Sequence, residues 1–442
     1  MKTPNTRLQL LCDAAGYSAA GLARAIGDVA RDQSTTFAPD PSTVRRWLAG
    51  TTPRPPAPAL VMECLARRLG RPVTAYEAGL SNTPLSPADP SFDADADPLR
   101  LLVRLIETDP DGLTNLGGRA FSIAALTLPT LEGQPRAARS YACSPSRSHR
   151  VTQADVFEMQ AVASTFHSLA ERYGGARLTT ALTAYLRQEA VPSLSAPAEA
   201  GIHQAMVSTA AQLTLVLAAM YADSAHDGTA QQYHRLAIRL ASESNDHAIL
   251  AIALRAMATH AHQLGHYGPA VLHLAEQATT HARHASPTAQ AYAAAELATL
   301  QAHHDRRAAI KTLGEAERFH SRAHSTPGPF TEYPAGALHY QRALVQEAFG
   351  DHAAAVESLT VSLRLRGPAE TRATALTHAR RAEVLQKMRR LDEAVHDWRM
   401  CLQAAPTLQS ARTRRALNTM HCSLRPHRHS PAVAALLKDS IL

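Results

Sequence analysis

Apolar residues in the first 80 positions recur three and four residues apart, the spacing of one helix face, which predicts several short amphipathic helices. The side chains expected on their buried faces are Leu8, Leu11, Cys12, Leu22, Ile26, Val29, Val44, Trp47 and Leu48. Gly16, Gly50 and Gly70 interrupt the pattern and are expected to end helices. Residues 1–80 are therefore expected to form a small helical domain, with a last short helix at 74–78.

The segment PDPSTVRRWLAG, residues 39–50, predicts a helix that Asp40 caps and Pro41 begins. Its apolar residues share one face, so the hydroxyl and arginine side chains between them must point outward. Such side chains near the N-terminus of a helix suit the base edges and phosphates of a DNA major groove. The candidate DNA-binding residues are Ser18, Ser42, Thr43, Arg45, Arg46 and Arg54. The alternative is that the arginines only solvate a helix face.

An internal repeat dominates the second half of the chain. Segments 264–278, 303–316, 349–362 and 389–402 each place an alanine, followed by valine or isoleucine, just after a polar or glycine break. These alanines are Ala270, Ala309, Ala355 and Ala394, spaced by 39, 46 and 39 residues, and Ala230 lies 40 residues before the first. This period predicts stacked helix pairs, with alanine where two backbones approach. We expect an all-α protein in which a helix-turn-helix domain precedes a helical solenoid.

Composition divides the chain into four regions. Residues 1–80 are expected to form the helix-turn-helix domain, and residues 81–97, rich in Pro, Ser and Asp, a flexible linker. Residues 98–209 are expected to form a connecting helical region and residues 210–442 the repeat array. Within the connecting region, the apolar run at 121–128 has no clear period and fits either a buried strand or a helix.

The overall composition favours an intracellular helical protein. Apolar residues make up 45% of the chain and aromatic residues only 5%, which is typical of packed helices. The five cysteines are scattered without a CxxC pair, which argues against a disulfide framework and indicates a reducing compartment. No apolar stretch is long enough to cross a bilayer. We therefore expect a cytoplasmic protein that does not contact a membrane.

Charge is distributed unevenly along the chain. Residues 1–80 carry ten basic and six acidic side chains, a net charge of +4. Residues 81–112 carry two basic and seven acidic side chains, a net charge of −5. A basic head is suited to a polyanionic partner such as double-stranded DNA, although this charge is also ordinary for a soluble domain.

The sequence contains no recognisable catalytic or cofactor motif. Three histidine pairs have the spacing of metal ligands on a helix, His262/His266, His281/His284 and His320/His324, but no carboxylate completes a metal motif beside them. The glycine pairs lack the context of a nucleotide-binding loop. We expect no metal, no cofactor and no enzymatic activity.

The first helices of a repeat array usually line a concave groove. Aligning the repeats on the marker alanines places these side chains in the groove: Gln212, Arg255, Thr259, His262, Gln263, Gln301, Tyr340, Glu347, Glu383 and Gln386. This polar mixture suits a peptide or a small polar effector, and equally a solvated groove without a ligand.

Several motifs carry a resemblance to known families. The order GYS at 16–18, then Leu22-Ala23, then Val44, Trp47 and Gly50, resembles lambda-repressor-like helix-turn-helix proteins. The repeated segments resemble tetratricopeptide repeats over about residues 210–406. Together with WLAGTTPRPPAPALVMECLARRLGRPVT, ERYGGARLTTALTAYL and AIRLASESND, they make the chain similar to actinomycete, Streptomyces-type regulators that join such a head to such repeats. The resemblance implies control of development or secondary metabolism, with the repeats as sensor or dimerisation body.

Two functional hypotheses follow. The first is a homodimeric transcriptional regulator that binds an operator through its head and senses an effector through its repeats. The second is a tetratricopeptide-repeat scaffold for another protein, with a degenerate head that does not bind DNA. The exposed face at 42–46 distinguishes them, because only a DNA-binding protein needs cationic donors there.

Overall fold

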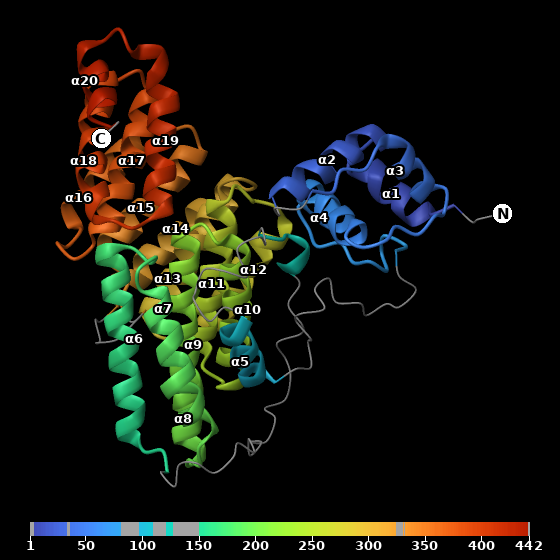
Figure 1. The fold of residues 1–442 in the computed structure, drawn as a ribbon. Coiled ribbons are helices and arrows are strands. Elements are labelled where there is room, and N and C mark those ends of the chain that lie inside the picture. The colour runs from blue at the N-terminus through green and yellow to red at the C-terminus, as the bar shows by residue number, and fades with distance from the viewer. Residues whose placement is uncertain are drawn as a thin grey trace.

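The computed structural model describes residues 4–32, 36–80, 97–108, 121–126, 150–323, 330 and 332–440, and every regular element in these ranges is helical. The expected all-α fold is confirmed. A small head, formed by the first four helices, lies beside a long body of helix pairs (Figure 1). Of the linker expected at 81–97, residues 81–96 lie outside the described ranges.

Four helices build the head: α1 (Thr6–Ala14), α2 (Ala19–Asp32), α3 (Pro41–Leu48) and α4 (Ala57–Leu69). Their expected apolar faces meet in its core, where all the residues named above are buried except Leu48, which is half-buried. Gly70 ends α4 with a φ of +66°, as its position predicted. The helix expected at 74–78 is instead a run of hydrogen-bonded turns, in which the amide of Leu80 donates to the carbonyl of Ala75.

The connecting region contributes helices of very different length: α5 (Pro98–Thr108), the 3-10 turn η1 (Ala124–Leu126), α6 (Gln153–Tyr173), α7 (Thr179–Tyr185), the π-helical turn η2 (Leu186–Ala190) and α8 (Val191–Ser195). The open question about residues 121–128 is answered for the part that the structure describes. Residues 121–126 are neither a strand nor an α-helix, and their apolar side chains are mostly buried.

The body is a series of antiparallel pairs: α9 (Ala200–Asp223) with α10 (Asp227–Glu243), α11 (His247–Gln263) with α12 (Pro269–Ala282), α13 (Pro287–Gln301) with α14 (Arg306–His320), α15 (Ala335–Ala348) with α16 (His352–Leu365), and α17 (Thr371–Lys387) with α18 (Leu391–Ala404). The turns η3 (Ala405–Thr407) and η4 (Arg425–His427) flank α19 (Ala411–Leu424), and α20 (Pro431–Asp439) follows. The expected start of the array at residue 210 falls inside α9.

Each marker alanine lies in the first turn of the second helix of a pair, where backbones approach closely. Ala230, Ala309, Ala355 and Ala394 are fully buried, whereas Ala270 is only half-buried. The 46-residue spacing arises because α14 and α15 are joined by residues 321–334, a longer connection than the others. Among the described residues, α9 alone has the length and apolar composition of a membrane span, but 72% of its apolar window is buried in the body.

Candidate DNA-binding surface and ligand groove

Residues at the start and on the inner face of α3 fix the position of this helix. The carboxylate of Asp40 accepts a hydrogen bond from the amide of Thr43 at 2.8 Å, and Pro41 occupies the first helical position. Hydrogen bonds from the Ser42 side chain and the Thr43 amide hold the pKa of Asp40 below its usual value. The side chains of Val44 and Trp47 lock the inner face into the head core.

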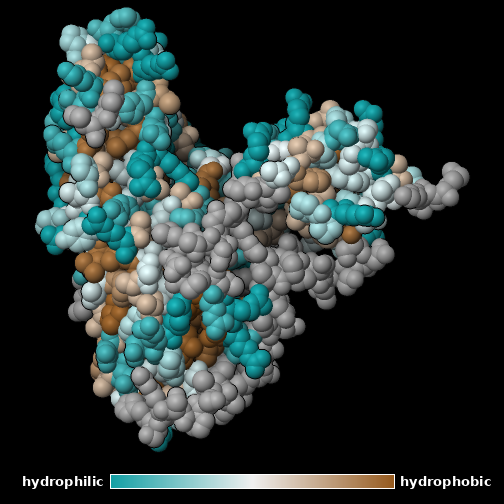
Figure 2. All heavy atoms as spheres, in the orientation of Figure 1, coloured by the Kyte–Doolittle hydropathy of each residue, from teal (hydrophilic) through white to brown (hydrophobic). Residues whose placement is uncertain are grey.

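The opposite face of α3 is free. Ser42, Arg45 and Arg46 are exposed and Thr43 is half-buried, and the guanidinium of Arg46 donates to the hydroxyl of Thr43 at 2.7 Å. The visible face of the head carries mostly hydrophilic residues (Figure 2). The four side chains therefore form one hydrophilic strip along a helix whose orientation is fixed by its buried face.

The other two candidate residues lie on different elements. Ser18 is exposed at the start of α2, where its hydroxyl accepts a hydrogen bond from the amide of Gly21 at 3.1 Å. Arg54 is exposed in the segment before α4. The connection between α2 and α3 spans residues 33–40, longer than the usual turn of a helix-turn-helix motif.

A contact that sequence reasoning missed joins the head to the body. The carboxylate of Glu63, on α4 and only 2% exposed, accepts hydrogen bonds from the Ser122 hydroxyl at 2.6 Å and from the amides of Ile123 and Ala124 at 3.2 and 3.3 Å. On the other side, the Gln231 side chain exchanges two hydrogen bonds with the backbone of Ser122. Residues 121–126 thus connect α4 to the body.

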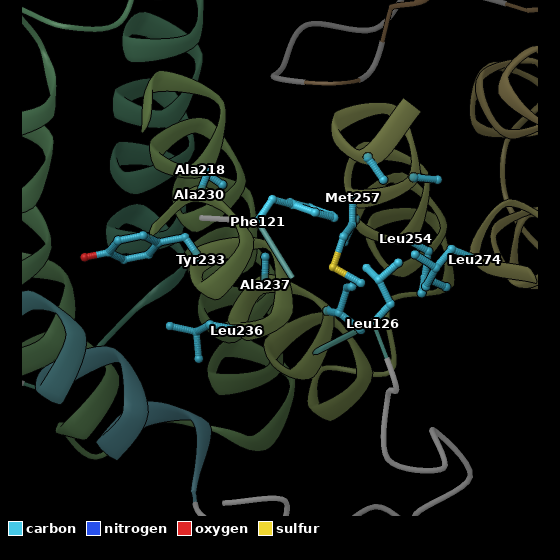
Figure 3. Packing of buried hydrophobic residues seen from close by; sticks show 14 of the residues in the cluster. Phe121, Leu126, Ala218, Ala230, Tyr233, Leu236, Ala237, Leu254, Met257 and Leu274 are labelled. Carbon is cyan, nitrogen blue, oxygen red and sulfur yellow. The ribbon is translucent and has the colours of Figure 1, made fainter. Parts of the chain in front are cut away.

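Apolar contacts anchor this connection in the body. Figure 3 shows Phe121 and Leu126 between α10, which carries Tyr233 and Leu236, and α11, which carries Met257. The ring of Phe121 also stacks on that of His266, with centroids 5.7 Å apart. The apolar run at 121–128 was visible in the sequence, but nothing in its spacing indicated a role as a connector.

A hollow of about 330 Å³ lies along the inner helices of the body. Five of the ten predicted groove residues line it: Thr259, His262, Gln263, Tyr340 and Glu383. They come from α11, α15 and α17, the first helices of their pairs, as the repeat alignment predicted. Lining residues that the alignment missed include Asp227, Glu296, Arg380, Arg412 and Arg415.

The other five predicted groove residues do not line this hollow. Arg255 lies beside it, 3.8 Å from Glu296 and over the ring of Tyr292, and Glu347 pairs with Arg380 at 2.9 Å. Gln212, Gln301 and Gln386 are half-buried. One buried polar atom each in Gln301 and Gln386 has no hydrogen-bond partner.

Carboxylates in the groove are stabilised in their charged form. Burial alone would raise the pKa of Glu296, but the hydrogen bond with His262 at 3.2 Å and the charge of Arg255 hold it below its usual value. The pKa of Asp227 is also below its usual value, because His260 and Arg415, each 3.1 Å away, oppose the effect of burial. The groove therefore contains charged pairs that are already satisfied within the chain.

A second hollow of about 420 Å³ adjoins the first and shares Tyr340, Leu376 and Arg412 with it. Its wall includes Glu171 on α6 and Arg372 on α17. Because the two hollows share these residues, we call them together the inner groove, which is lined mainly by α11, α15, α17 and α19.

The histidines with metal-ligand spacing make contacts with other side chains. His262 is paired with Glu296, His266 stacks on Phe121, and His281 stacks on His247 with centroids 5.8 Å apart. His324 lies outside the described residues, although His320 contacts the Tyr333 carbonyl. Within the described ranges no group of three His, Cys, Asp or Glu side chains is arranged to hold a metal ion.

Comparison with protein families matches the head of the chain. A model of the SP15 N-terminal domain family matches residues 8–81, which contain most of α1 and all of α2, α3 and α4. No curated protein matches the chain. The head is therefore similar to the SP15 N-terminal domain.

Proposed function

We propose that the chain is a sequence-specific DNA-binding transcriptional regulator that acts in the cytoplasm without enzymatic activity. The observation that carries the proposal is the exposed strip of Ser42, Thr43, Arg45 and Arg46 on a capped helix with a buried inner face. A helix held in this way presents its outer side chains without flexing, which direct reading of base edges requires. The net charge of +4 over residues 1–80 supports the same partner.

We also propose that the protein acts as a homodimer assembled through its helical body. A single small head makes few phosphate and base contacts, and helix-turn-helix proteins usually combine two heads on paired half-sites. Control of secondary metabolism or development belongs to this proposal through the family resemblance alone.

The test is the double variant Arg45→Ala, Arg46→Ala, measured by fluorescence anisotropy on an operator selected from random duplexes. A bidentate arginine contact to guanine contributes about 1 to 3 kcal/mol, so affinity should fall about tenfold to a thousandfold and its salt dependence should weaken. The proposed dimer predicts two chains per operator at saturation. Circular dichroism should be unchanged, because both side chains are exposed.

Two control variants make the result interpretable. Arg306→Ala, Arg307→Ala removes an equally adjacent, exposed arginine pair from α14 in the body and should leave affinity intact. Trp47→Ala should melt the head, since a buried tryptophan replaced by alanine costs about 3 to 5 kcal/mol. Full operator affinity in the folded Arg45→Ala, Arg46→Ala protein would reject α3 as the reader and favour the scaffold hypothesis.

A further inference from the structure

Arg412 is the unusual residue of the inner groove. It lines both hollows, and it is the only arginine among their described lining residues that makes no ion pair within the chain. The other four are paired: Arg366 with Glu370, Arg372 with Glu171 and Asp223, Arg380 with Glu347 and Glu383, and Arg415 with Asp227.

The position of Arg412 is costly for an unpaired cation. Burial together with the neighbouring charge of Arg372 lowers the pKa of Arg412, and Asp223 and Glu171 oppose this only in part. Both of these carboxylates already form ion pairs with Arg372. Arg412 is half-buried and lines both hollows without an ion partner, so an anion supplied from outside the chain would compensate its charge.

The surroundings of Arg412 restrict the anion that can bind. Tyr340 and Leu376 flank it in both hollows and offer an aromatic and an aliphatic surface. Glu383 on one side and Glu171 on the other are already paired with Arg380 and Arg372, so Arg412 offers one uncompensated positive charge, which a singly charged ligand balances. A planar guanidinium suits a carboxylate, which it can bind through two parallel hydrogen bonds.

We propose that Arg412 binds the carboxylate of a singly charged organic acid whose apolar part lies on Tyr340 and Leu376. The carboxylate could belong to a small hydrophobic acid or to the C-terminus of a short peptide, which share this chemistry. The site does not require that the head bind DNA, so the proposal stands or fails separately from the proposed function.

Titration calorimetry on the full chain tests the site. One arm uses phenylacetate and octanoate, and the other uses tetrapeptides ending in leucine or phenylalanine; every probe is paired with its primary amide. In at least one arm the acids should bind with a dissociation constant below about 1 mM, and the matching amides at least about tenfold more weakly. Which arm binds identifies the source of the carboxylate. No binding of any acid, or equal binding of acid and amide, overturns the proposal.

Variants then assign the binding to Arg412. Arg412→Gln should weaken acid binding about tenfold to a hundredfold, since a charge-assisted hydrogen bond is lost. Arg414→Gln, an exposed arginine two positions away on α19, is the matched control and should bind as the unchanged chain does. Equal affinity in the Arg412 and Arg414 variants would overturn the assignment.

Stability without ligand provides an independent readout. Because Arg412 makes no ion pair, Arg412→Met should melt at the same temperature as the unchanged chain or higher. A markedly lower melting temperature would mean that Arg412 holds the fold together, and would overturn its role as a ligand-binding residue.

Discussion

Single residues that act through local geometry could be predicted from the sequence. Asp40 caps α3 as expected, and Ser18 caps α2 in the same way, because a cap depends only on the next three amides. Gly70 shows the limit of this reasoning. Its positive φ was predictable, but a Cβ on Gly268 would lie 2.5 Å from the backbone of Gly70, a contact between head and body that no local pattern reveals. Arg412 was missed for the same reason, since its hollow is formed by distant helices.

Buried histidines predict a pH dependence at the residue scale. His234 is 3% exposed, and burial, with the neighbouring His260 ring, lowers its pKa well below the usual 6.5. Above pH 6.5 the ring is neutral in both folded and unfolded chains. Below it the unfolded chain takes up a proton that the folded chain resists, so stability falls as the pH falls.

The change that tests this is His234→Gln. When the pH falls from about 7.5 to about 5.5, His234 should lower the free energy of unfolding by about 1 kcal/mol. The variant lacks this effect, so its melting temperature should drop less over the same pH range. Part of the drop should remain, because other histidines with lowered pKa values, such as the half-buried His266, contribute to it. His427→Gln, at an exposed position, is the control. An unchanged pH dependence in the His234 variant would contradict the argument.

Helices and their pairing could be predicted where the pattern repeats. The marker alanines located the second helix of each pair because every crossing imposes the same demand for a small side chain. Residues 121–126 have no such periodicity. Their conformation is imposed by α4 on one side and by α10 and α11 on the other, so a sequence pattern could not separate strand from helix.

At the element scale we predict that Glu63→Gln loosens the junction between head and body. Glu63 accepts three hydrogen bonds from residues 122–124. In a glutamine one carboxylate oxygen is replaced by an NH2 group, which cannot accept a hydrogen bond from these donors. Loss of hydrogen bonds to a buried charge costs about 1.5 to 3 kcal/mol, which should speed hydrogen exchange of the Ile123 and Ala124 amides about tenfold or more.

The control for this junction is Glu77→Gln, which removes an exposed carboxylate paired with Arg71 within the head. Exchange at residues 123 and 124 should then match that of the unchanged chain, and the helices of the body should exchange alike in all three proteins. Unaltered exchange at Ile123 and Ala124 in the Glu63 variant would show that apolar packing of Phe121 and Leu126 alone holds the junction.

At the scale of the whole molecule, the helix series curves back on itself. The hydroxyl of Ser410, which caps α19, donates to Asp223 at the end of α9 at 2.6 Å, and the amide of Gln409 donates to the Tyr173 carbonyl at 2.9 Å. Arg372 on α17 joins the same point, 3.2 Å from Asp223 and paired with Glu171. Such closure depends on the curvature summed over all the repeats, which a repeat period alone does not fix.

This closure predicts strong coupling between residues far apart in the chain. Asp223 is 1% exposed, so Asp223→Asn would leave Arg372 with one carboxylate partner and should destabilise the body by about 3 to 5 kcal/mol. Arg372→Met should destabilise the body by a similar amount. In the double variant Asp223 and Arg372 no longer leave each other unpaired and only Glu171 lacks its partner, so the loss should be clearly smaller than the sum of the single losses. Thermal unfolding of the unchanged chain, the two single variants and the double variant measures this coupling. The control is Arg342→Met, which removes a half-exposed ion pair with Glu317 and should change the stability little. Additive losses would mean that Asp223 and Arg372 act independently and that helix stacking alone, without this contact between α9 and α17, sets the curvature of the inner groove.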